Sequence, residues 1–184
     1  MVEVEKLNAV WERLEKWYAE NHPTYSIPSG AAPANIIALE THIGLTLPEE
    51  LKASLMRHDG LDQWSSGELL SVNNIKEYWN QRAEMIDKGY FSDHECLLEP
   101  NDFIQKCWMS KSWVPVDSRG GADGHMVDLN PGAKGKVGQV MYFSHETGPE
   151  IPVFSNFIEY LEECARKLEA GEFVVMGGYL EERQ

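Results

Sequence analysis

The chain has 184 residues, a length at which one hydrophobic core is expected, because domains commonly hold about 100–200 residues. Its 16 Lys and Arg against 30 Asp and Glu give a formal net charge of −14, which repels phosphate backbones and so disfavours direct nucleic-acid binding. No apolar run reaches the roughly 18 residues of a membrane span, and the N-terminal sequence lacks a signal peptide's basic-then-apolar order. We therefore expect a single soluble, cytoplasmic domain over residues 1–184, with no membrane partner.

The acidity and the cysteines each have a plain explanation. Acidic residues serve solubility well, although the same charge would also attract a partner with a basic surface. Cys96, Cys107 and Cys164 are odd in number, widely spaced and without a Cys-x-x-Cys pair. Neither a disulfide framework nor a thiolate zinc site is indicated, and we expect buried free thiols.

Four helices are predicted in the first half of the chain. Apolar residues from Val4 to Tyr18 recur at alternating steps of three and four, which places them on one face of an amphipathic helix. Proline in a first turn and glycine after a last turn mark two more helices, and an asparagine cap begins the fourth. The first helix is predicted to end before His22-Pro23, and the second to span residues 33–43. The third is predicted to run from Pro48 to His58. The fourth is predicted to run from Asn73 or Asn74 to Gly89, with a short strand at 67–72 before it.

The second half is organised around a predicted β-meander. Residues 113–116 and 125–129 alternate or run apolar for the length of a strand, and each stretch is followed by residues that end strands. Glycine and aspartate fill the turn at 119–124, where the chain must reverse. Further extended segments are predicted at 137–144 and 149–153.

A closing helix and an irregular segment complete the fold. Ser155 is predicted to cap a helix whose inward face runs from Phe157 to Leu168 and which Gly171 ends. Residues 90–112 have no clean period, and we expect an insertion there with a short helix near 102–108. Together the elements predict an α+β fold, in which a largely antiparallel meander sheet packs against several helices.

Several short segments follow one another in a characteristic order: LPEEL at 47–51, HDG at 58–60, WVPV at 113–116, GGADG at 120–124, VDL at 127–129 with Pro131, GQV at 138–140, and SNF at 155–157 with Tyr160-Leu161. With these segments the chain resembles the SUKH superfamily, in particular the Smi/Knr-like proteins named after a fungal cell-wall assembly regulator. The resemblance covers residues 11–168, the expected core of a single SUKH-like domain. The long 90–112 segment and Ser118-Arg119 before the glycines depart from the family pattern.

The resemblance implies a non-enzymatic α+β domain that acts by binding proteins. In bacterial members the implied role is immunity, the neutralisation of a polymorphic or contact-dependent toxin that is often a nuclease. In fungal members it is regulation of cell-wall synthesis through protein contacts. Because we expect no long flanking segments of the fungal type, we favour an immunity protein whose acidic surface covers a basic toxin domain. The alternative is a regulatory scaffold of the cell-wall assembly regulator type.

Metal and cofactor chemistry were tested against residue spacing. Five acids and histidines lie near one predicted sheet edge: Asp117, Asp123, His125, Asp128 and His145. Counted from Asp117 as the first position, Arg119 occupies the third, where a calcium loop needs an oxygen ligand, and no His-Glu-x-x-His spacing occurs. The glycine-rich turns do not match a phosphate-binding loop, and no nucleophile signature is present. We therefore predict no metal or cofactor, and a metal- or small-molecule-dependent enzyme is the less favoured class.

Candidate partner-binding residues come from turns and from tryptophans in irregular context. Tryptophan is enriched at interfaces, and two of the six tryptophans sit outside the predicted periodic segments, whereas Trp11, Trp79 and Trp113 are expected in the core. The turn that ends in His125 is the part of the meander expected to touch a partner. The candidate set is Asp59, Trp64, Trp108, Asp117, Arg119, Asp123 and His125.

Overall fold

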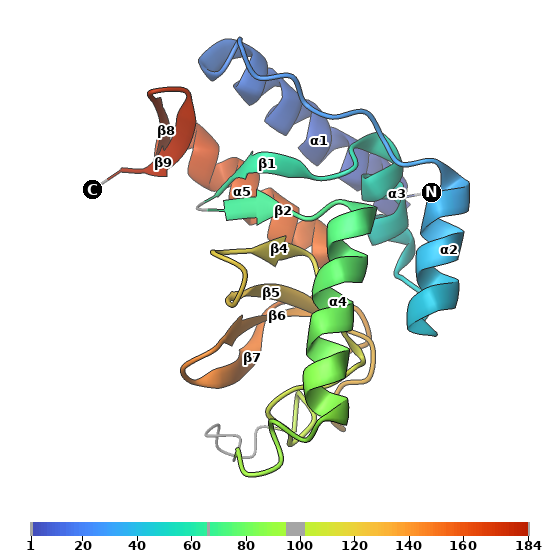
Figure 1. The fold of residues 1–184 in the computed structure, drawn as a ribbon. Coiled ribbons are helices and arrows are strands. Elements are labelled where there is room, and N and C mark those ends of the chain that lie inside the picture. The colour runs from blue at the N-terminus through green and yellow to red at the C-terminus, as the bar shows by residue number, and fades with distance from the viewer. Residues whose placement is uncertain (1, 66, 95–101, 184) are drawn as a thin grey trace.

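The computed structural model describes residues 2–65, 67–94 and 102–183 (Figure 1). Its helices are α1 (Val2–Asn21), α2 (Pro33–Ile43), α3 (Glu49–Arg57), α4 (Val72–Asp87) and α5 (Phe157–Glu169). Its strands are β1 (Leu61–Trp64), β2 (Gly67–Leu69), β3 (Trp113–Pro115), β4 (Asp117–Ser118), β5 (Gly124–Asp128), β6 (Gln139–Ser144), β7 (Gly148–Phe154), β8 (Phe173–Met176) and β9 (Tyr179–Glu182). The predicted α+β fold is confirmed. Among these residues no helix is both long enough and apolar enough to cross a membrane.

The strands form a meander sheet and two smaller sheets, all antiparallel. The meander sheet has the order β3-β5-β6-β7, a three-stranded sheet has the order β1-β2-β4, and β8 and β9 form a hairpin. Val116 joins the first two sheets, because its carbonyl accepts from Leu70 N and its own N–H donates to the carbonyl of His125. Figure 1 accordingly shows the strands stacked from β1 to β7, with α5 behind them and α4 in front.

Helix boundaries follow the local signals, with two corrections at the caps. Helices α1 and α2 end as predicted, and Gly44 closes α2 in the left-handed conformation with φ of 70°. The cap of α4 is Ser71 and not an asparagine, because the serine side chain accepts from Asn74 N. In the same way Asn156, and not Ser155, caps α5 by accepting from Glu159 N. A cap is the residue whose side-chain oxygen reaches the free N–H groups of the first turn.

The predicted short helix at residues 102–108 does not form. The carbonyls of Asp102 and Phe103 accept hydrogen bonds from Lys134 N and Gly132 N instead of from their own next turn. These long-range bonds hold the segment as a series of bends against the loop after β5. Strands β1, β4, β8 and β9 were not predicted, and β2 is shorter than the predicted strand at 67–72.

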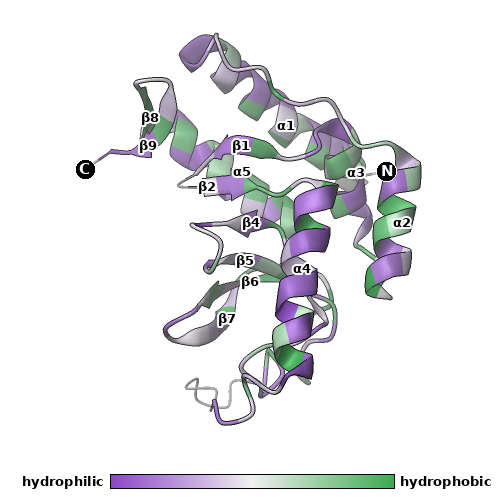
Figure 2. Cartoon of the chain, in the orientation of Figure 1, coloured by the Kyte–Doolittle hydropathy of each residue, from purple (hydrophilic) through white to green (hydrophobic). Residues whose placement is uncertain are grey.

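Both faces of the meander sheet are covered. Alternate residues of β3, β5 and β6, namely Val114, Val127 and Val140, face the main core, which α1, α2, α3 and α5 complete. Their neighbours face a second cluster built largely by the irregular segment before β3: Ile104, Trp108, Met109, Trp113, Met126, Met141 and Phe143. Figure 2 shows bands of green and purple on the helices, as expected when one side of each helix is buried.

Candidate binding site

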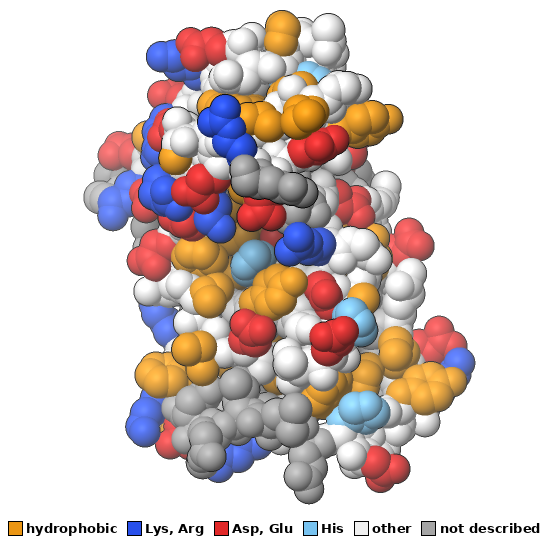
Figure 3. Space-filling view, turned by 90° about the vertical axis from the view of Figure 1, so that its left-hand side faces the viewer, with side chains coloured by type: hydrophobic (Ala, Val, Ile, Leu, Met, Phe, Trp, Pro, Cys, Tyr) orange, Lys and Arg blue, Asp and Glu red, His pale blue; other side chains and the backbone are white. Residues whose placement is uncertain are grey.

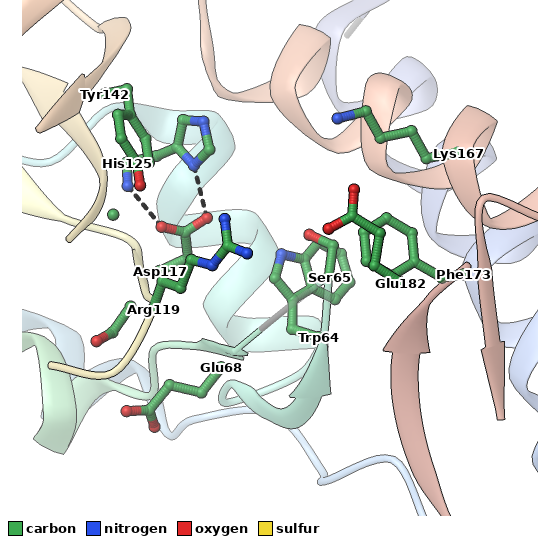
Figure 4. A pocket seen from close by; sticks show the side chains of 12 residues that line it. Trp64, Ser65, Glu68, Asp117, Arg119, His125, Tyr142, Lys167, Phe173 and Glu182 are labelled. Atoms are coloured by element: carbon green, nitrogen blue, oxygen red, sulfur yellow. Dashed lines mark hydrogen bonds and ion pairs between the residues drawn. The ribbon is translucent and has the colours of Figure 1, made fainter. Parts of the chain in front are cut away.

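A pocket of about 240 Å³ opens beside β4, and we call it the polar pocket. Its lining comes from seven strands, the C-terminal part of α5, and the β1–β2 and β4–β5 turns: Trp64, Ser65, Glu68, Asp117, Ser118, Arg119, Gly124, His125, Tyr142, Lys167, Phe173 and Glu182. Figure 3 views the molecule from this side and shows hydrophobic side chains and a histidine amid acidic and basic groups. Figure 4 shows several charged side chains around the opening.

Asp117 is the centre of a buried hydrogen-bond network under this pocket. One carboxylate oxygen accepts from the backbone N–H of His125 at 2.5 Å. The other lies 2.7 Å from His125 Nδ1 and accepts from the Tyr160 hydroxyl at 2.6 Å. That hydroxyl in turn accepts from the indole N–H of Trp64 at 2.7 Å. Both carboxylate oxygens are therefore satisfied, and the His125 ring is fixed at the pocket wall (Figure 4).

Aromatic rings hold His125 in place beside the carboxylate. Its ring centroid lies 4.9 Å from that of Tyr160 and 5.2 Å from that of Tyr142. Because Nδ1 faces Asp117, the second ring nitrogen is the one left for other contacts. The arrangement presents an oriented imidazole to whatever enters the polar pocket.

The network sets the protonation of its members. Burial alone would raise the pKa of Asp117, but the hydrogen bonds and charge of His125 and the Tyr160 hydroxyl outweigh it and hold that pKa below the usual 3.8. Burial and then the neighbouring Asp117 charge raise the pKa of Tyr160 well above its ordinary value. Burial also raises the pKa of the Cys164 thiol to about 12. Asp117 is thus a carboxylate beside a neutral phenol and a neutral thiol.

Two glycines allow the strands to approach closely at this site. A Cβ on Gly124 would lie 2.5 Å from the backbone oxygen of Asp117, and a Cβ on Gly67 would lie 2.0 Å from that of Ser118. Real Cβ atoms do not come so close to backbone oxygens, so a side chain at either position would push the strands apart. The last glycine of the GGADG segment is therefore required by strand packing.

The charges at the rim differ in how they are paired. Glu68 accepts from Asn74 Nδ2 and from the Tyr78 hydroxyl. Within the described residues, neither Arg119 nor Lys167 has a carboxylate within 4 Å, although both line the pocket. Two cations therefore face the opening with no salt bridge to the described chain.

The structure brings four of the seven predicted residues together and separates three. Trp64, Asp117, Arg119 and His125 line the polar pocket. Asp123 lies at the far end of the same turn, where it accepts from the backbone N–H of His145 at 2.7 Å and pairs with its ring at 2.8 Å. The other two members of the set lie elsewhere in the fold: Asp59 and Trp108.

Two expectations about individual residues need correction, and a third residue has a structural contact. Trp64 is 1% exposed and Trp108 is 8% exposed, so neither is a surface anchor. Trp64 supports the Asp117 network from below, while Trp108 packs in the second cluster. Asp59 accepts from Val72 N at 2.7 Å and so stabilises the first turn of α4, and its candidate partner contact stays a prediction.

The acids and histidines considered as metal ligands form separate pairs. Asp117 pairs with His125 and Asp123 with His145, whereas Asp128 accepts from Gln139 Nε2. Across residues 2–65, 67–94 and 102–183, no group of three or more His, Cys, Asp or Glu side chains is arranged to hold a metal ion.

Sequence reasoning missed several residues of the site. Tyr160 is 43 residues from its carboxylate partner and Trp64 is 96 residues from Tyr160, so no local spacing signals either contact. Lys167 and Glu182 come from α5 and β9, beyond the segments considered for the site. The signal within reach was the Tyr160-Leu161 pair, which already formed part of the family resemblance.

Together, a meander sheet, flanking helices and a polar pocket at the first meander turn define an α+β domain. A model of the SMI1/KNR4 family (SUKH-1) matches residues 30–163, and the chain belongs to this family. The resemblance seen in the sequence is thereby confirmed.

Three relatives illustrate the range of the family. The chain is 23% identical over 207 residues to the glucan synthesis regulatory protein of Neurospora crassa, covering 90% of this chain and 39% of that protein. It is 25% identical over 186 residues to the cell wall biosynthesis/cell cycle regulator smi1 of Schizosaccharomyces pombe, covering 90% and 36%. It is 33% identical over 82 residues to the uncharacterized protein YnaB of Bacillus subtilis, covering 42% and 56%. The chain thus spans less than two fifths of these two fungal relatives.

Proposed function

We propose that this chain is a protein-binding regulatory domain whose partner contacts the polar pocket and the turn at residues 119–124. The observation that carries the proposal is the Asp117 network, which holds His125 at the wall of an open pocket. The two fungal relatives that cover 90% of this chain are named as regulators of glucan synthesis and of cell-wall biosynthesis. Those names favour regulation over the toxin immunity that we expected first.

Charge indicates what kind of partner surface would associate fastest. The net charge of −14 attracts a basic surface over long range. At the pocket itself, Arg119 and Lys167 would meet acidic or carbonyl groups of the partner. The proposed partner is therefore basic overall and carries an acidic or polar residue at the centre of the contact.

The test is affinity capture from cells of the native source, with the chain as bait. We expect the double variant Arg119→Ala with Lys167→Ala to lose the partner that the unchanged chain recovers. The matched control is Lys6→Ala with Lys76→Ala, two exposed lysines on α1 and α4. Both pairs remove two positive charges, so long-range attraction changes equally and only the pocket contact differs. Equal recovery by both double variants would contradict the assignment of the pocket.

Toxin neutralisation is the second candidate, supported by the same acidic charge. In that case the partner would be a basic toxin domain, and co-expression with a toxin from the adjacent reading frame would protect cells. Protection would favour immunity. A complex recovered from cells that contain no toxin gene would favour the regulatory role.

A further inference from the structure

A second pocket, of about 310 Å³, lies on the other side of the turn at residues 119–124, and we call it the apolar pocket. Gly121 and Ala122 of the turn line it, whereas Arg119 and Gly124 line the polar pocket. The remaining walls come from the second half of α4, from the segment between α4 and β3, and from β6 and the turn after it. Their apolar side chains are Met85, Phe91, Trp108, Met109 and Phe143.

Arg82 of α4 is the unusual member of this lining. It is only 9% exposed, and its hydrogen bond to the carbonyl of Tyr78 is long, at 3.4 Å. Its guanidinium carbon also lies 5.7 Å from the Tyr78 ring centroid. Among the residues that the structure describes, no carboxylate comes within 4 Å of it. A guanidinium has five N–H donors, so most of its capacity is unused by the described chain.

Burial of this cation opposes folding. Desolvation lowers the pKa of Arg82, and the charge interaction with Tyr78 opposes that shift without cancelling it. A buried charge without a partner is costly, and folded proteins normally pair such a group or bind an ion to it. A ligand that supplies the missing anion to Arg82 would offset this cost.

The rest of the lining is consistent with an anionic ligand. Asp and Glu outnumber Lys and Arg by 30 to 16 in the whole chain, yet the described lining of the apolar pocket contains no Asp or Glu. Its other titratable groups are His94 and His145. Hydrogen bonding and charge from Asp123 raise the pKa of His145, which favours its cationic form.

We propose that the apolar pocket binds a small apolar molecule that carries one carboxylate. The carboxylate pairs with Arg82 through two parallel N–H···O bonds, the geometry that a guanidinium favours. The hydrocarbon part lies against Trp108, Met109 and Phe143. A volume of about 310 Å³ is at the lower end of small-molecule sites, so the ligand is small. This site shares Gly121 and Ala122 with the turn of the proposed protein contact, but the proposal does not depend on that contact.

The test uses the full chain and six probes: phenylacetate, cinnamate and octanoate, each with its amide. Calorimetric titration measures binding, and a thermal melt measures stabilisation by the bound probe. We expect at least one carboxylate to bind and its amide to bind about tenfold or more weakly, because the charge-assisted pair is lost. Arg82→Met should weaken carboxylate binding to the level of the amide. Arg119→Ala, on the polar side of the turn, should leave it unchanged.

The melting temperature without a probe separates a ligand-binding arginine from a structural one. If Arg82 serves a ligand, Arg82→Met removes an unpaired buried charge, and the melting temperature stays equal or rises. A clear fall would make Arg82 structural and overturn the proposal. Met85→Trp is the second variant. Met85 is 40% exposed, so a larger ring there fills the pocket without changing Arg82 and should block carboxylate binding. Absence of binding by all three carboxylates, or equal binding of acids and amides, would also overturn it.

Discussion

The two pockets beside the turn at residues 119–124 treat their buried charge in opposite ways. In the polar pocket Asp117 receives hydrogen bonds from His125 and Tyr160, so its charge is satisfied within the fold. In the apolar pocket Arg82 has one long bond to a backbone carbonyl and no described carboxylate partner. The first arrangement rigidifies a protein surface, whereas the second leaves binding capacity for a ligand. The turn at residues 119–124 thus lies between a preorganised contact surface and a pocket whose buried arginine has no carboxylate partner among the described residues.

The largest expected effect is the stability lost when a core residue next to the Asp117 network of the polar pocket is truncated. Leu161 is fully buried in the main core, next to Tyr160 on α5. Leu161→Ala should lower the free energy of unfolding by about 2–5 kcal/mol, through lost burial and a cavity. The matched control is Ile151→Ala on β7, which is 54% exposed and should cost within about 0.5 kcal/mol. Denaturant unfolding measures both, and similar values for the two variants would contradict the assigned core.

The next effect tests the Asp117 network directly. Tyr160→Phe removes the hydroxyl that donates to Asp117 and accepts from Trp64. We expect a loss of about 1–3 kcal/mol in unfolding free energy, because two buried polar groups lose their partner. Tyr142→Phe is the control, since within the described residues its hydroxyl makes no hydrogen bond. If the control lost as much stability as Tyr160→Phe, the network would not explain the effect.

Some features of the core and of the Asp117 network could be predicted from local sequence signals, and others could not. Proline at the start of α2 and Gly44 at its end are local signals, and both boundaries followed from them. The turn that carries Asp117 and His125 could be picked out because the pair lies eight residues apart. Trp64 and Tyr160 join that pair only through tertiary packing, so Trp64 was wrongly expected at the surface.

The segment before β3 shows the same limit for backbone structure. Its sequence suggested a helix near residues 102–108, but carbonyls of Asp102 and Phe103 bond to the loop at 132–134. Trp108 and Met109 then pack on the face of the sheet that carries Met126 and Met141. Hydrogen bonds and packing with residues distant in the sequence therefore override the local helix propensity of this segment. The apolar pocket, which this segment helps to build, could not be predicted for the same reason.

A smaller effect is expected in how the stability of the protein depends on acidic pH. The pKa of Asp117 is held below 3.8 in the folded protein, so its contribution to stability is fully present above that value and is lost as pH falls through the folded pKa. Asp117→Asn should therefore be less stable than the unchanged chain near about pH 7, and the difference should shrink below about pH 4. Urea midpoints across this range measure it. A difference that is constant with pH would mean that the charge of Asp117 is not what the network stabilises.

The smallest effect is expected at the exposed end of the turn, where Asp123 pairs with His145. Hydrogen bonding and charge from Asp123 raise the pKa of His145 above 6.5, so any stability from this pair is present below 6.5 and lost as pH rises through the folded pKa. Asp123→Asn keeps an acceptor for the backbone N–H of His145 but removes the charge. NMR titration should show the pKa of His145 falling toward 6.5, with the melting temperature unchanged within error, because exposed pairs contribute little. A destabilisation as large as that of Tyr160→Phe would instead make the turn itself depend on this pair, and the contrast between its buried and exposed ends would fail.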